Sequence, residues 1–272
     1  MAFSKNTTMA LPRFFSIKLL VLLGLLYGQA CQSSTSSPTS PAGMVLLPAD
    51  EENDAPPLYV DVKEVTVADF RTFIEATDYI TEAEDYGWSG VFSYDSLNWL
   101  PVDGAIWHHP MGLDTTAAAE DEPVTQVSLR DALAYAEWAG KRLPTEAEWL
   151  RAASYNGRYQ EYPWGEEELP GGKYLGNWWQ GYFPFDNQNL DGFPGIAPIG
   201  SYPPTELGLY DISGNVWEWT TTEANGQYVI RGGSFLCSNS YCSGFNLQQR
   251  QYTPADSGLN HMGFRCVKDV EG

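Results

Sequence analysis

The sequence predicts an α+β domain in which irregular backbone outweighs helices and strands. Three observations favour this class: helix start signals occur at three places, strand candidates are short, and the chain beyond Tyr155 is rich in glycine, proline and aromatic residues. The chain has 26 glycines, 18 prolines and 14% aromatic residues. This composition is typical of a turn-rich fold stabilised by the packing of large aromatic side chains. Irregular backbone on this scale needs fixing points, and we expect bound metal ions to supply them.

The predicted helices each begin at a capping pair, in which Ser or Thr is followed three residues later by an acidic residue. The pairs are Thr66 with Asp69, Ser128 with Asp131 and Thr145 with Glu148, and they open helices over residues 67–76, 129–139 and 146–153. The first helix has Phe70, Phe73 and Ile74 on one face, and the second has Leu133, Ala136 and Trp138 as apolar positions. Residues 228–231 and 263–267 are the strand candidates.

The first 30 residues are expected to be a signal peptide that is not part of the fold. Three basic residues precede an apolar run over residues 19–26, and small residues precede Cys31. The run is too short to span a bilayer comfortably. The segment resembles a bacterial lipoprotein signal, in which Cys31 becomes the acylated first residue of the mature chain. Secretion without a lipid and a retained anchor are the alternatives.

Residues 31–43 are rich in Ser, Thr and Pro and predict a flexible tether, so the folded domain is assigned to residues 44–270. Residues 1–30 hold three of the 15 basic and none of the 35 acidic residues, which leaves 12 against 35, a net charge of −23. Such a charge argues against nucleic acid and anionic membranes as partners and favours cations, including calcium, and basic peptides. Solubility alone also explains most of these carboxylates.

Cys237 and Cys242 are the strongest chemical signal in the chain. Only four cysteines exist, and four residues separate these two. Two thiols at this spacing can converge on one soft metal ion or close a small disulfide ring, and they can also stay inert. The spacing alone leaves these alternatives open.

Several blocks resemble the formylglycine-generating enzyme (sulfatase-modifying factor) family, in the family's order. They are Gly140-Lys-Arg-Leu-Pro-Thr-Glu-Ala-Glu-Trp149, Pro163-Trp-Gly165, the run from Gly208 to Trp219, Arg231-Gly-Gly-Ser234 and Gly263-Phe-Arg265. The resemblance implies one domain related to the C-type-lectin-like fold, with little regular secondary structure and calcium ions that hold it. Membership alone does not imply activity, since some relatives only bind ligands.

For the cysteine pair, the resemblance implies a copper enzyme. Cys237 and Cys242 match the two cysteines that hold Cu(I) in active members, and thiolate is a soft ligand suited to that ion. The implied reaction uses O2 to oxidise the cysteine of a Cys-x-Pro-x-Arg motif, in an unfolded sulfatase polypeptide, to Cα-formylglycine. Ser234 would hydrogen-bond oxygen species or substrate, or else its own turn. Trp217 and Arg250 match residues of the substrate groove, although core packing and surface charge are their alternative roles.

The resemblance also implies two structural calcium sites. Their ligands would be carboxylate, amide and backbone carbonyl oxygens, which suit this hard ion, although ordinary turn residues are the simpler interpretation. The first site comprises Asn177, Trp178, Asp191 and Phe193, and the second comprises Asp211, Gly214, Val216 and Glu218.

Some positions depart from the family pattern. Ser243-Gly-Phe-Asn246 replaces an arginine-rich run, His261 stands where Asn is common, and Cys266 has lost its disulfide partner. These departures leave the copper ligands in place but put the identity of the substrate in doubt.

We therefore expect an exported oxidoreductase of the bacterial cell envelope, which touches the membrane only through its lipid anchor. The alternative is a non-catalytic envelope lipoprotein that uses the same fold as a binding or scaffold module. An iron-dependent sulfoxide synthase needs a histidine cluster, and the chain has only His108, His109 and His261. A closed zinc site needs more ligands than two thiols.

Overall fold

The computed structural model describes residues 40–155, 158 and 160–271, which belong to one compact unit spanning Thr39–Gly272. The predicted signal peptide, the predicted acylation site Cys31 and most of the predicted tether lie outside the described residues. Within those ranges, no helix has the length and apolar character needed to cross a membrane.

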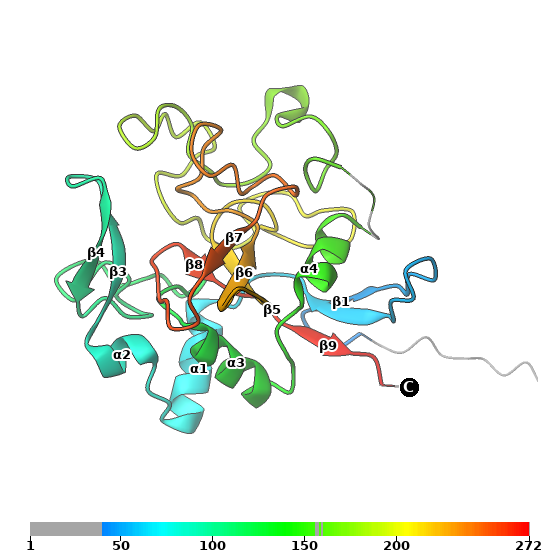
Figure 1. Cartoon of the computed structure of the whole chain (residues 1–272), viewed down its shortest axis with the longest axis horizontal. Coiled ribbons are helices and arrows are strands. Elements are labelled where there is room, and N and C mark those ends of the chain that lie inside the picture. The colour runs from blue at the N-terminus through cyan, green and yellow to red at the C-terminus, as the bar shows by residue number, and fades with distance from the viewer. Residues whose placement is uncertain (1–39, 156–157, 159, 272) are drawn as a thin grey trace, which may run out of the picture. The chain divides into compact units, whose positions relative to one another are not determined.

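The described strands form three small sheets around a large amount of irregular chain, as the α+β prediction states. Figure 1 shows the irregular segments gathered on one side of the four-stranded sheet, and the helices α1 and α3 on the other. The first sheet has the order β1(Met44–Leu47), β2(Leu58–Asp61), β9(Val267–Asp269), and the second is the hairpin β3(Trp88–Ser93)–β4(Asn98–Asp103). The third has the order β7(Gln251–Thr253), β6(Gln227–Arg231), β5(Trp217–Ala224), β8(Met262–Gly263), with β5 and β8 parallel.

Of the two predicted strands, residues 228–231 are confirmed as part of β6. The single strand predicted over residues 263–267 is wrong, because the chain there ends β8 and begins β9 in a different sheet. The hydrogen bonds explain the division. Val65 N–H donates to the Phe264 carbonyl, and Val267 exchanges both backbone hydrogen bonds with Arg142.

All three predicted helices are confirmed, and each has the complete capping box that its sequence predicts. They are α1(Val67–Thr77), α3(Leu129–Trp138) and α4(Glu146–Ala153), to which the structure adds the short α2(Glu82–Tyr86) and a 3-10 turn at Pro170–Gly172. In α1, Phe70 and Phe73 are buried as predicted.

The apolar positions predicted for α3 are only partly right. Ala136 is buried, but Leu133 and Trp138 are each 42% exposed. The buried face instead runs through Ala132 and Tyr135, because Tyr135 packs against Phe70 and Phe73 of α1.

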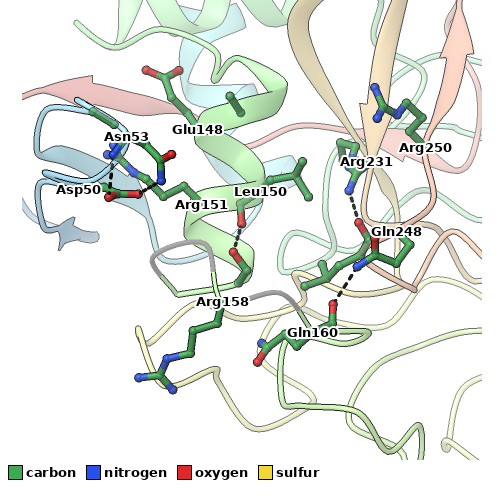
Figure 2. Close-up of a pocket in the computed structure, with 14 residues that line it drawn as sticks. Asp50, Asn53, Glu148, Leu150, Arg151, Arg158, Gln160, Arg231, Gln248 and Arg250 are labelled. Carbon is green, nitrogen blue, oxygen red and sulfur yellow. Dashed lines mark hydrogen bonds between the residues drawn. The ribbon is translucent and has the colours of Figure 1, made fainter.

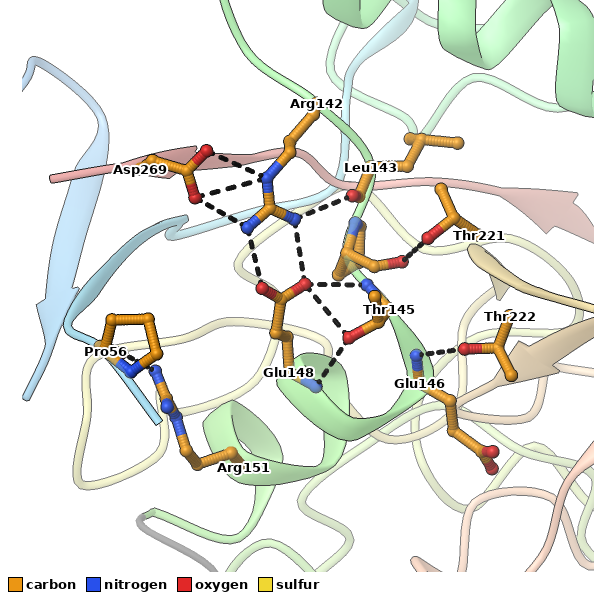
Figure 3. A network of polar contacts seen from close by, with 11 residues as sticks. Pro56, Arg142, Leu143, Thr145, Glu146, Glu148, Arg151, Thr221, Thr222 and Asp269 are labelled. Carbon is orange, nitrogen blue, oxygen red and sulfur yellow. Dashed lines mark hydrogen bonds and ion pairs between the residues drawn. The ribbon is translucent and has the colours of Figure 1, made fainter. Parts of the chain in front are cut away.

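The block from Lys141 to Trp149 is a structural motif. Figure 3 shows Arg142 between Glu148 and Asp269, with hydrogen bonds of 2.7–3.3 Å that link α4 to β9. Glu148 also accepts from the backbone N–H of Thr145, at 2.8 Å, and so closes the capping box. These contacts hold α4 against the edge of the first sheet.

Stacked aromatic rings hold the irregular region. Trp178 stacks on Phe245 with ring centroids 4.6 Å apart, and on Trp164 at 6.1 Å, while Tyr162 stacks on Trp164 at 5.5 Å. Aromatic pairs of this kind contribute about 0.5–1.5 kcal/mol each beyond the area they bury. Trp178 and Phe245 belong to the main buried core, so the stack anchors the loops to the sheet beneath them.

Candidate active site

The cysteine pair lies in the loop between β6 and β7. A tight turn holds its first half, since Cys237 N–H donates to the Ser234 carbonyl at 2.9 Å and Trp179 N–H donates to the Cys237 carbonyl at 2.8 Å. Cys237 is 1% exposed, whereas Cys242 is partly exposed and has a positive φ of 73°. One sulfur is therefore fixed in the core and the other sits at its edge.

The structure joins the two sulfurs in a disulfide, with the Cα atoms 5.2 Å apart. This is one of the alternatives that the spacing left open, and it is not the free pair that the copper prediction requires. Bonded sulfurs cannot act as thiolate ligands, so that prediction applies to the reduced protein. After reduction, the pair supplies two soft donors at one point, which fits Cu(I). The Ser234 hydroxyl lies 3.9 Å from the Cys237 sulfur and accepts from the Leu236 N–H.

The pair borders a pocket of about 120 Å³ that is rich in aromatic side chains. His261 also lines it, and its ring stacks on Trp99 with centroids 4.6 Å apart. Burial lowers the pKa of His261 to about 3, so the imidazole is neutral at physiological pH. Besides both cysteines and Ser234, the lining includes Phe92, Trp99, Phe183, Trp217, Tyr241, Tyr252 and His261.

Trp217 and Arg250, the two predicted groove residues, lie in different places. Trp217 is 1% exposed, lines the cysteine pocket and packs against Gly244 so closely that a Cβ at Gly244 would lie 2.2 Å from its ring. Arg250 does not line this pocket. It belongs to a separate cavity and donates to Glu146 at 3.0 Å. Its role in substrate binding stays a prediction.

The first predicted calcium group is brought together in one loop cluster. The Asp191 carboxylate accepts from the backbone N–H groups of Trp178 and Phe193, both at 3.1 Å. Asn177 is 1% exposed, and its amide donates to the Gly195 carbonyl and to Asn215. The Trp178 carbonyl accepts from the Gln180 side chain. The Asp191 carboxylate, the Trp178 carbonyl and the amide nitrogen of Asn177 thus already have protein partners.

The second predicted calcium group is more unusual, because one of its two buried carboxylates has an oxygen without a hydrogen-bond partner in the described structure. Asp211 accepts from the Gly200 N–H at 2.7 Å, but its Oδ1 atom is buried without a partner in the described structure. Glu218 is 1% exposed and bonded to Arg265 and Trp149. Gly214 lies against Asn177, where a Cβ would be 2.1 Å from the Asn177 carbonyl oxygen, and Val216 is fully buried.

Glu64 belongs beside this group, although the sequence did not single it out. It is fully buried, its Oε1 has no partner among the described residues, and its Oε2 accepts from Asn215 at 3.2 Å. Burial, followed by the charges of Asp211 and Glu218, raises its pKa well above the usual value, and burial raises that of Asp211 to about 6. In the sequence, the only signal for Glu64 is that an acidic residue directly precedes Val65, which the structure shows to be buried.

Two buried carboxylate oxygens without partners fit a cation site. However, no three His, Cys, Asp or Glu side chains among the described residues are grouped so that they could hold a metal ion. A calcium ion at either group would therefore depend largely on carbonyl oxygens, as the predicted ligand sets already imply.

Comparison with known proteins identifies the family. The family described as "Sulfatase-modifying factor enzyme 1-like domain" matches residues 25–270. The chain belongs to this family. The predicted family and fold class are thereby confirmed.

Relatives within the family differ in activity. The chain is 36% identical to the formylglycine-generating enzyme of Mus musculus, over 90% of this chain and 78% of that protein. It is also 39% identical to a Bos taurus protein named "Inactive C-alpha-formylglycine-generating enzyme 2", over 78% of this chain and 77% of that protein. Among solved structures, PvdO from Pseudomonas aeruginosa matches with a TM-score of 0.57 at 19% identity, covering 84% of this chain and 90% of PvdO, which supports the fold alone.

Proposed function

We propose that this family member is an enzyme that oxidises a cysteine of a sulfatase polypeptide to Cα-formylglycine, using Cu(I) and O2. One observation carries the proposal: Cys237 and Cys242 meet at a pocket large enough to admit a small group. The family and the name of the mouse relative support the reaction type.

The reduced pair would hold the copper ion, which supplies redox chemistry that the side chains cannot perform. The Ser234 hydroxyl lies 3.9 Å from the Cys237 sulfur and lines the same pocket. The aromatic side chains of the lining would offer flat surfaces to an extended segment containing Cys-x-Pro-x-Arg. In balance, the substrate carbon would lose two electrons and a thiol reductant would supply two more, which together reduce O2 to two waters. Hydrolysis, which consumes one water, would then release the substrate sulfur as hydrogen sulfide and leave the aldehyde.

The test uses the mature protein reduced, loaded with Cu(I) and supplied with a thiol, air and a Cys-x-Pro-x-Arg peptide. We expect an aldehyde on the peptide, detected by hydroxylamine capture and mass spectrometry. A peptide with Ser in place of Cys is the matched control and should stay unchanged. If bound copper is verified and no aldehyde forms, the proposal is wrong.

A second candidate function is a non-catalytic binding or scaffold module of the envelope. The disulfide between Cys237 and Cys242 favours it, and so does the existence of a relative named inactive. Titration of the pair separates the two candidates: a scaffold would keep the disulfide in a physiological thiol buffer, whereas the enzyme would show two free thiols.

We further propose that calcium stabilises the fold at the two predicted groups. The partnerless oxygens of Asp211 and Glu64, within the described part of the chain, support a cation at the second group. Calcium at about a hundredfold its dissociation constant adds about 2.7 kcal/mol, which raises the melting temperature by roughly 5–10 °C for a domain of this size. We expect this shift when CaCl2 is added to EGTA-treated protein, measured by calorimetry. MgCl2 should give a much smaller shift, and equal melting temperatures with and without calcium would contradict the site.

Export with a lipid on Cys31 is proposed on the signal-like N-terminal segment. When the full chain is expressed in a bacterium fed an alkyne-tagged fatty acid, we expect the label on the mature protein. Cys31→Ser should remove the label, while Cys266→Ala should keep it. Label that persists in the Cys31 variant would refute acylation at this residue.

A further inference from the structure

A larger cavity, of about 530 Å³, lies on the other side of the β6–β7 ribbon from the cysteine pocket. Successive strand residues point to opposite faces. Accordingly, Ile230 lines the cysteine pocket while Arg231 lines this cavity, and the same division holds for Gln251 and Arg250. The two spaces therefore lie on opposite faces of the same ribbon. Of the residues assigned to the proposed oxidation, only Arg250 lines the larger one.

This cavity gathers positive charge in a strongly acidic protein. Four of the 12 basic residues beyond residue 30 line it: Arg151, Arg158, Arg231 and Arg250. The two acidic residues of the lining are already engaged. Asp50 accepts from the Asn53 side chain at 2.8 Å, and Glu148 is paired with Arg142 at 2.7 Å. The lining therefore carries four guanidinium groups and two carboxylates, with Arg158 itself paired with Glu206 at 3.4 Å, and this balance is opposite to the overall charge of the chain.

Arg231 and Arg250 share a single carboxylate. Glu146 accepts from Arg231 at 3.2 Å and from Arg250 at 3.0 Å, so the trio keeps one positive charge in excess. Arg231 is 1% exposed, donates also to the Leu247 carbonyl and leaves its Nε atom without a partner in the described structure. Burial, together with the charge of Arg250 and despite that of Glu146, lowers the pKa of Arg231 to about 10. An uncompensated buried cation is costly unless an anion approaches it.

Figure 2 shows Arg231, Arg250 and Gln248 side by side on one flank of α4, with Leu150 directed toward them. Arg151 extends on the other flank toward Asp50 and Asn53. The side chain of Arg250 is 47% exposed, so its remaining donors are accessible from the cavity mouth. Leu150 and Leu247 add an apolar wall. A cavity of this volume holds a small organic molecule rather than a bare ion.

We propose that this cavity binds a small organic anion, whose sulfate, phosphate or carboxylate group contacts Arg231 and Arg250 while its apolar part packs against Leu150 and Leu247. Guanidinium groups recognise these three oxyanions through paired hydrogen bonds of similar geometry. Which of them binds best is decided by measurement.

The test is calorimetric titration of the mature protein with 4-nitrophenyl sulfate, 4-nitrophenyl phosphate and 4-nitrobenzoate, with 4-nitroanisole as the neutral match. We expect the anions to bind, the neutral compound not to, and affinity to fall as NaCl rises. Arg250→Gln should weaken anion binding roughly tenfold, because it removes a charged hydrogen-bond donor, and Arg250→Lys should weaken it less. Arg250 is half-exposed, so an unchanged melting temperature will show that the variants are folded.

Two controls locate the binding. Arg130→Gln removes an arginine whose side chain is 76% exposed and lies outside the cavity, and it should leave affinity unchanged. Cys237→Ser changes the other pocket and should also leave the affinity for the anions unchanged. The result is therefore independent of whether the protein oxidises peptides. Absence of anion binding, or equal weakening in Arg130→Gln and Arg250→Gln, would overturn the proposal.

Discussion

Cys237→Ser and Cys242→Ser are each expected to abolish aldehyde formation on a Cys-x-Pro-x-Arg peptide, with a loss of roughly a thousandfold or more in kcat/KM. Serine is nearly isosteric with cysteine, but its hydroxyl is a hard and weakly acidic donor that does not replace a thiolate toward Cu(I). Because both sulfurs serve one ion, the double variant should be no less active than either single variant.

Cys266→Ala is the matched control for these variants. Cys266 is fully buried in the main core, and burial raises the pKa of its thiol well above the usual value. It is therefore an inert thiol, and its removal should keep activity while lowering stability slightly. Copper content is measured for every variant. If either single variant bound copper and formed aldehyde at the normal rate, the pair could not be the copper site.

Glu218→Gln is expected to lower the free energy of unfolding by about 3–5 kcal/mol. Glu218 and Arg265 are each 1% exposed, and their closest contact is 2.7 Å. The amide keeps an acceptor for the Trp149 indole N–H, which bonds to Glu218 at 2.7 Å, but it removes the charge opposite the guanidinium. An unpaired buried cation is the main cost, and urea denaturation measures it.

Glu223→Gln is the control on the same strand, because Glu223 is exposed near the end of β5. We expect a change within about 0.5 kcal/mol. Measurements in EGTA separate the contribution of the ion pair to stability from any role of Glu218 as a calcium ligand. In the double variant Glu218→Gln/Arg265→Met, part of the lost free energy of unfolding should be recovered. A loss below about 1 kcal/mol in Glu218→Gln would mean that the pair does not stabilise this core.

Features encoded within a few residues could be predicted from the sequence. The three capping boxes were predicted correctly, because the cap residue and its partner are only three residues apart. Their hydrogen bonds can form wherever the chain makes a helix turn. The buried face of α3 was not predicted correctly. Leu133 and Trp138 stay exposed because Tyr135 has Phe70, Phe73 and Phe264 as neighbours, and these come from elsewhere in the chain.

The candidate site divides in the same way. Cys237 and Cys242 are five positions apart, so their meeting follows from a short loop. Arg250 lies eight positions beyond Cys242, yet it lines a different cavity, because strand alternation on the ribbon directs it to the other face. Glu64 joins Asp211 and Glu218 only through packing between distant segments, so no local pattern announced it.

By itself the sequence determined the family, the fold class and the three capped helices, because these depend on residue identity and short spacing. Only the tertiary structure decided which charges share a carboxylate, which oxygens are buried without partners in the described chain and which side of β6 each arginine faces. Those properties depend on distances between segments far apart in the chain, and burial turns each of them into a large free-energy term.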